Sequence, residues 1–107
     1  NSVNETAVKA SAGQLYGISV FSLNDAPVYV KMYNDTTGNI DENDTPILRV
    51  MSPANATAAL GAGAVWDGGT AGMQFSTAIT MRITKGIADN STTAVDAAEV
   101  IVNVCYK

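Results

Sequence analysis

Alternation of apolar and polar residues is the strongest pattern in the chain. From Met73 to Ile83 one alternate set is mainly apolar, whereas the other set, which includes Gln74, Thr80 and Arg82, is mainly polar. A half-buried strand requires this period of two, because successive side chains of a strand point to opposite faces of the sheet. A helix would scatter the same apolar residues and would contain several threonines, which are poor helix formers. We therefore predict a half-buried strand over Met73–Ile83.

Other segments carry strand signals of the same kind. β-Branched, aromatic and alternating apolar residues mark Gly13–Ser22, Pro27–Tyr33, Pro46–Met51 and Glu99–Tyr106, and weaker signals mark Thr6–Ser11 and Ala62–Trp66. Polar turn residues separate them. Asn24–Pro27 predicts a hairpin connection, Asn34–Thr45 a polar loop, and Lys85–Ala98 a long loop with a short helical turn near Thr93–Ala98.

This arrangement predicts the fold class. About six to eight short strands with turn-rich connections indicate an all-β sandwich or barrel. The longer connections favour Greek-key or jelly-roll crossings over a simple meander. We expect residues 1–107 to form a single jelly-roll-like antiparallel β-sandwich domain.

Charge and composition narrow the classes of function. Hydrophobic residues make up 47% and charged residues 15% of the 107 residues, and the net charge is −4. The six basic residues are scattered, so we expect neither nucleic acid nor an anionic membrane as a partner. No apolar run is long enough for a transmembrane helix. A surface poor in charge suits contact with another protein, because few charges must be desolvated.

Catalytic chemistry finds little support in the residues. Histidine is absent, and Cys105 is the only cysteine, so neither the usual general base nor a thiol–imidazole pair is available. Asp67, Asp89, Asp96 and Glu99 are candidate carboxylates for glycosidase chemistry, but all except Glu99 fall in turn-like segments, where Asp is common for backbone reasons. We expect no enzyme activity, no catalytic residue, no cofactor, no metal and no small-molecule ligand.

Two motifs have weaker functional interpretations. Asn39–Thr45 places oxygen ligands at alternate positions, as in the first half of a calcium loop, but the expected glycine and the final glutamate are missing. A solvated acidic turn is the favoured interpretation. Asn-X-Ser/Thr triplets, which would be glycan acceptors in a secreted eukaryotic protein, begin at Asn4, Asn34, Asn43, Asn55 and Asn90.

Four side chains are candidates for a protein interface. Tyr29, Tyr33 and Arg49 are of residue types enriched at interfaces. Lys31 lies between the two tyrosines and suggests the rim of such an interface. Trp66, the only tryptophan, is expected to serve as a core or interface residue rather than as a sugar-stacking platform.

Several segments resemble a family of small virion proteins from tailed bacteriophages. The resemblance lies in the pattern of strand and turn residues at Ser11–Ser22, Asp44–Val50, Met73–Thr80, Gly86–Val95 and Val100–Lys107. It implies a capsid decoration (cement) protein, made in the bacterial host cytoplasm and placed on the outer capsid surface of the virion. It further implies a homotrimer that binds the major capsid protein and bridges capsomers, and it carries no catalytic residues.

The sequence therefore favours a non-enzymatic virion structural protein that stabilises the head. A tail or fibre structural module is the alternative within the same class. A carbohydrate-binding β-sandwich that uses Trp66 and loop carboxylates, with or without calcium, is the alternative among binding modules, and a secreted glycoprotein domain is a further one.

Overall fold

In the computed structural model, which describes residues 5–40, 44–55, 61–87, 95 and 100–107, every regular element is a β-strand. The strands of these residues are β1 (Thr6–Lys9), β2 (Gly13–Ser22), β3 (Val28–Tyr33), β4 (Leu48–Ser52), β5 (Ala62–Asp67), β6 (Met73–Phe75), β7 (Ile79–Thr84) and β8 (Val100–Tyr106). All pairings between them are antiparallel. The prediction of an all-β antiparallel chain is confirmed.

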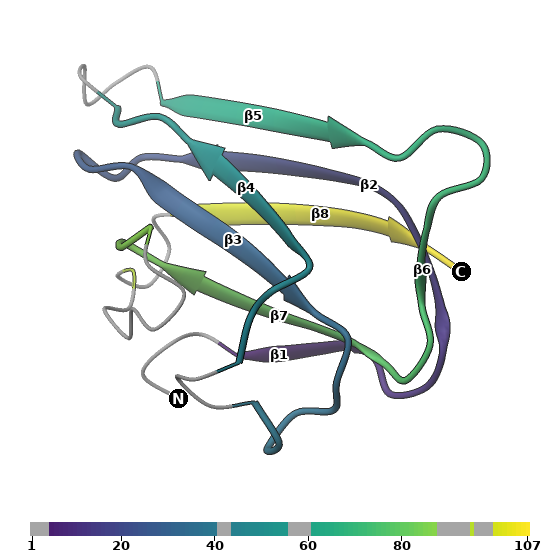
Figure 1. Ribbon diagram of the computed structural model, residues 1–107. Coiled ribbons are helices and arrows are strands. Elements are labelled where there is room, and N and C mark those ends of the chain that lie inside the picture. Colours follow the sequence, from purple (N-terminus) through teal and green to yellow (C-terminus); the bar gives the residue numbers. More distant parts are fainter. Residues whose placement is uncertain (1–4, 41–43, 56–60, 88–94, 96–99) are drawn as a thin grey trace.

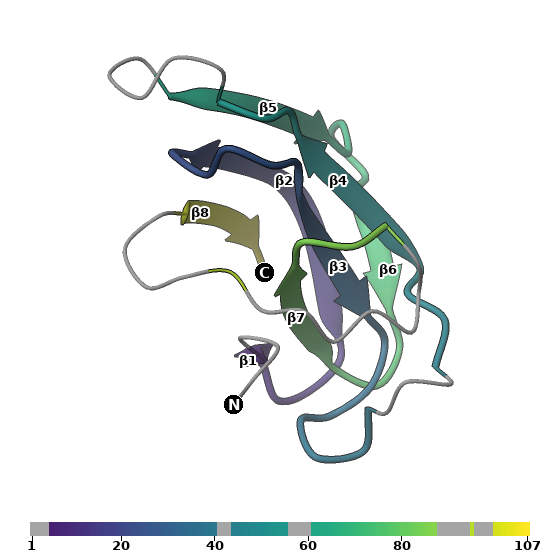
Figure 2. The ribbon, with the colours of Figure 1, turned by 90° about the vertical axis from the view of Figure 1, so that its left-hand side faces the viewer.

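The strands form two sheets that face each other as in a β-sandwich (Figure 1, Figure 2). Sheet A has the order β1-β7-β3-β4. Sheet B is built on β2, which pairs with β8 on one side and with β5 and β6, lying end to end, on the other. Strands β4 and β5, from different sheets, are neighbours at one edge of the two layers. The chain changes sheet repeatedly, so most strands pair with partners distant in sequence.

Alternate residues of the strands fill the space between the sheets. This core consists of Leu15, Ile18, Val20, Val28, Val30, Met32, Val50, Phe75, Ile79, Met81 and Ile83. Both sheets contribute to it, since strand side chains alternate between the two faces of a sheet. Trp66 and the three valines of β8 are partly buried against the same core.

The segment Met73–Ile83 forms two strands rather than one. Strand β6 pairs with β2 in sheet B, whereas β7 pairs with β1 and β3 in sheet A. The crossing between them is held by Asn34, whose side-chain oxygen accepts the backbone N–H of Thr77 at 2.8 Å and whose amide nitrogen donates to Ser76 Oγ at 2.9 Å. Phe75 and Ile79 both reach the core, but the alternation is interrupted between them, because Thr77 is exposed and Ala78 is buried.

The prediction of a hairpin at Asn24–Pro27 is wrong. The segment connects β2 in sheet B with β3 in sheet A, and the two strands do not pair. Asn24 is 2% exposed, and its side-chain oxygen accepts the backbone N–H of Ala26 at 3.0 Å. Its own carbonyl accepts the N–H of Asn55 at 2.9 Å, which fastens this crossing to the start of the connection that follows β4.

The outer face of sheet A is buried over β7 and the middle of β3, although its residues there are polar, whereas Arg49 and Met51 on β4 are exposed. Thr80, Arg82 and Thr84 on β7 and Lys31 on β3 are at most 8% exposed. The prediction of a half-buried strand is therefore wrong for β7, and Lys31 does not lie at a rim. The cover includes the segment after β3, because Thr80 donates its hydroxyl to the carbonyl of Asp35 at 2.6 Å.

Arg82 is the centre of this covered face. Its guanidinium donates to both the Glu5 carboxylate, at 3.0 and 3.1 Å, and the Ile40 carbonyl, at 2.6 Å. It also lies 5.7 Å from the centroid of the Tyr33 ring, within range of a cation–π contact. Because the side chains of Arg82 and Glu5 are only 10% and 8% exposed, this ion pair is shielded from solvent. It attaches two segments that precede β1 and β4 to the outside of sheet A.

Within the described residues, no helix is long and apolar enough to cross a membrane.

Replacing Glu5 with alanine should lower the free energy of unfolding by about 3 kcal/mol, because it leaves the Arg82 guanidinium buried without its carboxylate. Urea unfolding followed by tryptophan fluorescence measures the change. Asp25→Ala, which removes an exposed carboxylate, is the matched control and should change stability by less than about 0.5 kcal/mol. Equal effects of the two substitutions would show that the Glu5–Arg82 pair does not contribute to the free energy of unfolding.

Candidate interaction surface

The outer face of sheet B is a regular surface that the described residues leave uncovered. The registers of β5, β2 and β8 align its outward residues in three rows. These rows are Asp67–Gly17–Cys105, Val65–Ser19–Asn103 and Gly63–Phe21–Ile101. We call these nine positions the sheet B face. Asp67, at one corner, is its only charged residue.

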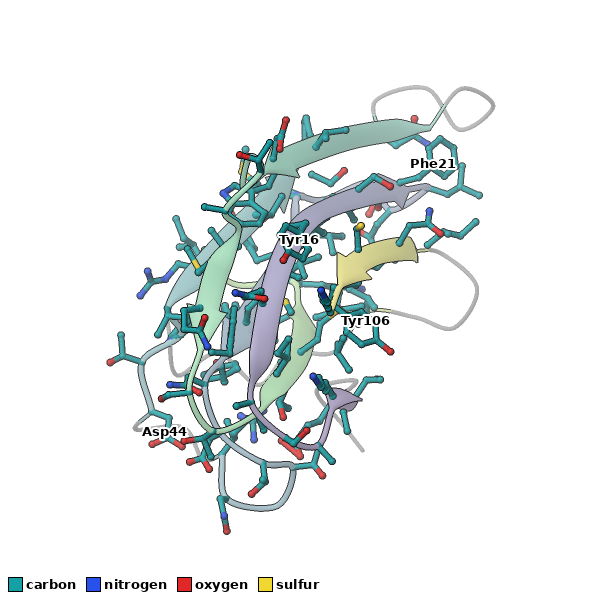
Figure 3. All side chains as sticks on the ribbon, turned by 90° about the vertical axis from the view of Figure 1, so that its right-hand side faces the viewer. Tyr16, Phe21, Asp44 and Tyr106 are labelled. Atoms are coloured by element: carbon teal, nitrogen blue, oxygen red, sulfur yellow. The ribbon has the colours of Figure 1, made fainter. Side chains whose placement is uncertain are left out.

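Large apolar side chains on this face are exposed. Val65 is 77%, Ile101 58% and Phe21 43% exposed, one from each of the three strands. An antiparallel sheet that faces water normally carries polar residues on its outer side. A contiguous apolar group on a regular surface is instead a mark of an interaction site. Figure 3 shows Phe21 near the end of β2 and Tyr16 further back along the same strand.

Small residues leave a shallow hollow in the middle of the sheet B face. Its volume is about 300 Å³, and its lining includes Gly17, Ser19, Val65, Asn103 and Cys105. The hollow forms because a glycine and a serine on β2 lie between larger side chains on the two flanking strands. The polar atoms of Ser19 and Asn103 are close together, with the amide donating to the hydroxyl at 3.4 Å. A protruding apolar side chain of a partner protein fits such a surface better than a charged ligand does.

Two glycines shape the ends of β5. Gly61 has φ of 75°, a conformation that side chains other than glycine rarely adopt, and the ring of Phe21 lies against its backbone. At the other end, the backbone N–H of Gly68 donates to the Tyr16 carbonyl at 2.8 Å. Asp67 is held in this turn, because its carboxylate accepts the N–H of Gly69 at 2.8 Å.

Three of the four predicted interface residues lie on the opposite sheet. Tyr29, Tyr33 and Arg49 all belong to the outer face of sheet A, where Lys31 pairs with Arg49 on β4 and Arg82 on β7. Arg49 is exposed and Tyr29 is half-buried, but Tyr33 is only 3% exposed. Tyr33 therefore offers a partner protein almost no surface of its own, because the chain already covers it.

Trp66 does not belong to the sheet B face. It pairs across strands with Ile18, a core residue, and its side chain packs against the core from the inner side of sheet B. Its half-buried ring also lies close to the backbone of Gly68. The expectation of a core role is in line with this position, and the ring is not displayed as a flat platform for sugar stacking.

The acidic turn between β3 and β4 is described in part. Asp35, Asp44, Asn34 and Thr45 line a hollow of about 140 Å³, and Figure 3 shows Asp44 at its edge of the molecule. Residues 41–43 of the acidic segment Asn39–Thr45 lie outside the described residues. Among the residues that are described, no three side chains of histidine, cysteine, aspartate or glutamate come together as a metal site.

Two of the five Asn-X-Ser/Thr triplets can be placed. The Asn34 side chain binds the crossing between β6 and β7, and Asn55 is 6% exposed with its amide donating to the Leu23 carbonyl at 3.4 Å. Both amides therefore have structural roles within the chain. Asn4, Asn43 and Asn90, which begin the other three triplets, lie outside the described residues, as does the predicted helical turn at Thr93–Ala98 except for Val95.

Comparison of the chain with models of protein families, with characterised proteins and with solved structures finds no match.

Sequence reasoning missed the residues of the sheet B face, although a signal for them exists. Gly13–Ser22 and Val100–Tyr106 contain no charged residue, and Ala62–Asp67 contains one. Three strands almost free of charge would be expected to be buried on both sides. Their alignment in one sheet, with one side uncovered by the described residues, is visible only in the fold.

The Cys105 thiol should react with a thiol reagent in the native protein, because it lies exposed on the sheet B face. Absorbance with an aromatic disulfide reagent should show one equivalent released without denaturant, with an amplitude equal to that in urea. Cys105→Ser provides the zero-reaction control. A thiol that reacts only after unfolding would place the face on the inside of an assembly or of the chain.

Proposed function

We propose that this chain is a non-enzymatic virion structural protein, a capsid decoration protein that binds the assembled major capsid protein and stabilises the head. The observation that carries the proposal is the sheet B face, a regular surface with exposed Val65, Ile101 and Phe21 and with one charge at its corner. The bacteriophage resemblance supplies the identity of the partner, and the jelly-roll-like topology belongs to the same proposal.

The size of the face supports a partner that is repeated in space. Three strands spaced about 4.8 Å apart, each contributing about 20 Å of length, give a flat footprint of about 300 Å². A stable protein complex buries about 800 Å² on each partner. One copy would therefore bind weakly, whereas several copies held together on a lattice would gain affinity through avidity.

Binding of this kind would stabilise a capsid by mass action. A protein that binds the assembled lattice, and not the free subunits, shifts the equilibrium toward the lattice. The low charge of the face reduces the cost of desolvation on contact. The bacteriophage resemblance implies a homotrimer that lies on the outer capsid surface. A tail or fibre module with the same face is the second structural candidate.

Co-sedimentation with assembled capsids of the source virus tests this function. The native chain should pellet with capsids, and Val65→Asp should reduce the bound fraction by about tenfold, because it buries an unpaired charge at the contact. Met51→Asp is the matched control, since Met51 is an exposed apolar residue of β4 in sheet A. It should bind like the native chain.

Binding to purified tails but not to capsids would favour the fibre or tail module. Equal loss of capsid binding in both variants would place the contact elsewhere than on the sheet B face. A native chain that binds neither capsids nor tails would refute the structural role.

A further inference from the structure

Strand β8 is an edge of sheet B in the described residues, and its own residues lack the usual protection against further pairing. Within the described residues it pairs with β2 alone. Its seven residues, Val100–Tyr106, contain no proline and no charge. Natural proteins normally interrupt long edge strands with charges, proline or bulges, because an open edge is a template for another strand. The extra residue at the one irregularity of this ladder lies on β2, so β8 itself is regular.

The direction of the backbone hydrogen bonds along β8 shows which residues present their N–H and C=O groups to its open side. Lys107 and Gln14 exchange two backbone hydrogen bonds of 3.0 and 3.1 Å, so Lys107 directs its N–H and C=O toward β2. Because the direction alternates along an antiparallel strand, Cys105, Asn103 and Ile101 do the same. The intervening residues, which include Val102 and Val104, present their N–H and C=O groups to the open side.

We propose that β8 pairs antiparallel with β8 of a second copy of this chain, with Asn103 on the two-fold axis. Asn103 is the midpoint of Val100–Tyr106. In this register Val102 of each copy lies opposite Val104 of the other, and Val100 lies opposite Tyr106. These are the residues whose backbone groups are directed outward, so the two edges satisfy each other's hydrogen bonds over the whole strand.

The side chains are compatible with this register. Asn103 faces Asn103 of the second copy, and Ile101 faces Cys105, so no charged residue of the strand meets a like charge. This matters because each copy carries a net charge of −4. Val100, Val102 and Val104 are only half-buried in the single chain, although they point toward the core. A neighbouring strand would cover them further, which gives the pairing an apolar contribution.

The pairing would also enlarge the sheet B face. Directly opposite residues of an antiparallel pair lie on the same side of the sheet. The faces of the two copies would therefore join into one surface across six strands, with a footprint of about 600 Å² in place of about 300 Å². This consequence rests on the proposed function, whereas the pairing itself does not. The dimer is two-fold, so it differs from the trimer that the resemblance implies.

Disulfide cross-linking tests the register. In a Cys105→Ser background, Asn103→Cys would place two thiols opposite each other at a Cα separation of about 4.5–5.5 Å, which a disulfide can span. Oxidised glutathione should convert most of the protein to a covalent dimer on a non-reducing gel. The native Cys105 should not cross-link, because the two copies of this residue would lie about 14 Å apart.

Ser19→Cys in the same background is the matched control. Ser19 lies on the sheet B face beside Asn103, but on β2, so its two copies would also be about 14 Å apart. The cross-linked fraction should be at least about fivefold lower than for Asn103→Cys. Equal cross-linking of the two variants, or cross-linking through native Cys105, would overturn the proposed register.

A second measurement avoids cysteine chemistry. Asn103→Asp should weaken self-association in sedimentation equilibrium by about fivefold, because it sets two like charges directly opposite each other. Ser19→Asp adds the same charge one strand away and should have a smaller effect. A chain that is monomeric at high concentration, or trimeric without the Asn103 cross-link, would refute the pairing. A monomer that still pellets with capsids would refute the pairing and leave the proposed function intact. A cross-linked dimer that does not bind capsids would support the pairing and refute the proposed function.

Discussion

A two-sheet domain has four sheet faces, and one shared core can cover only two of them. This constraint governs the whole molecule. The inner faces meet around Leu15, Val30, Phe75 and their neighbours. The two outer faces need another solution, because a sheet surface is either polar and hydrated, covered by the chain itself, or covered by another molecule. The two sheets of this protein have adopted different solutions.

The outer face of sheet A is covered from within the chain over β7 and the middle of β3. The face is basic, since Arg49, Lys31 and Arg82 are aligned across β4, β3 and β7. A buried basic residue requires a partner, because an unpaired charge in a low-dielectric environment is costly. Glu5 supplies the carboxylate for Arg82, and the carbonyl of Ile40 supplies a further acceptor. The same contacts hold segments distant in sequence against the sheet. They therefore both neutralise the buried charge and cover this part of the sheet.

The outer face of sheet B is nearly uncharged, and the described residues leave it open. Its strands carry glycine, serine and exposed aliphatic residues where an isolated hydrated sheet would carry lysine, glutamate or threonine. A surface of this composition costs little to desolvate but is too small to form a strong contact alone. Those two properties together support the proposed weak, repeated binding to an ordered protein array and the proposed pairing of two copies at β8.

The sequence alone determined the strand content of this protein, because a period of two is a local property that each strand carries by itself. It located Gly13–Ser22 at its observed bounds and most other strands to within a few residues, but it joined β6 and β7 into one strand over Met73–Ile83. Which strands pair, and which polar residues are buried, was decided only by the tertiary structure. In the sequence, Lys31 and Arg82 look like solvent-facing residues of alternating strands. The carboxylate of Glu5, 77 positions away in sequence, offsets the cost of burying Arg82. Likewise, Ser19, Val65 and Asn103 become one surface only through the register of three strands, and register depends on contacts across the whole chain rather than on any local pattern.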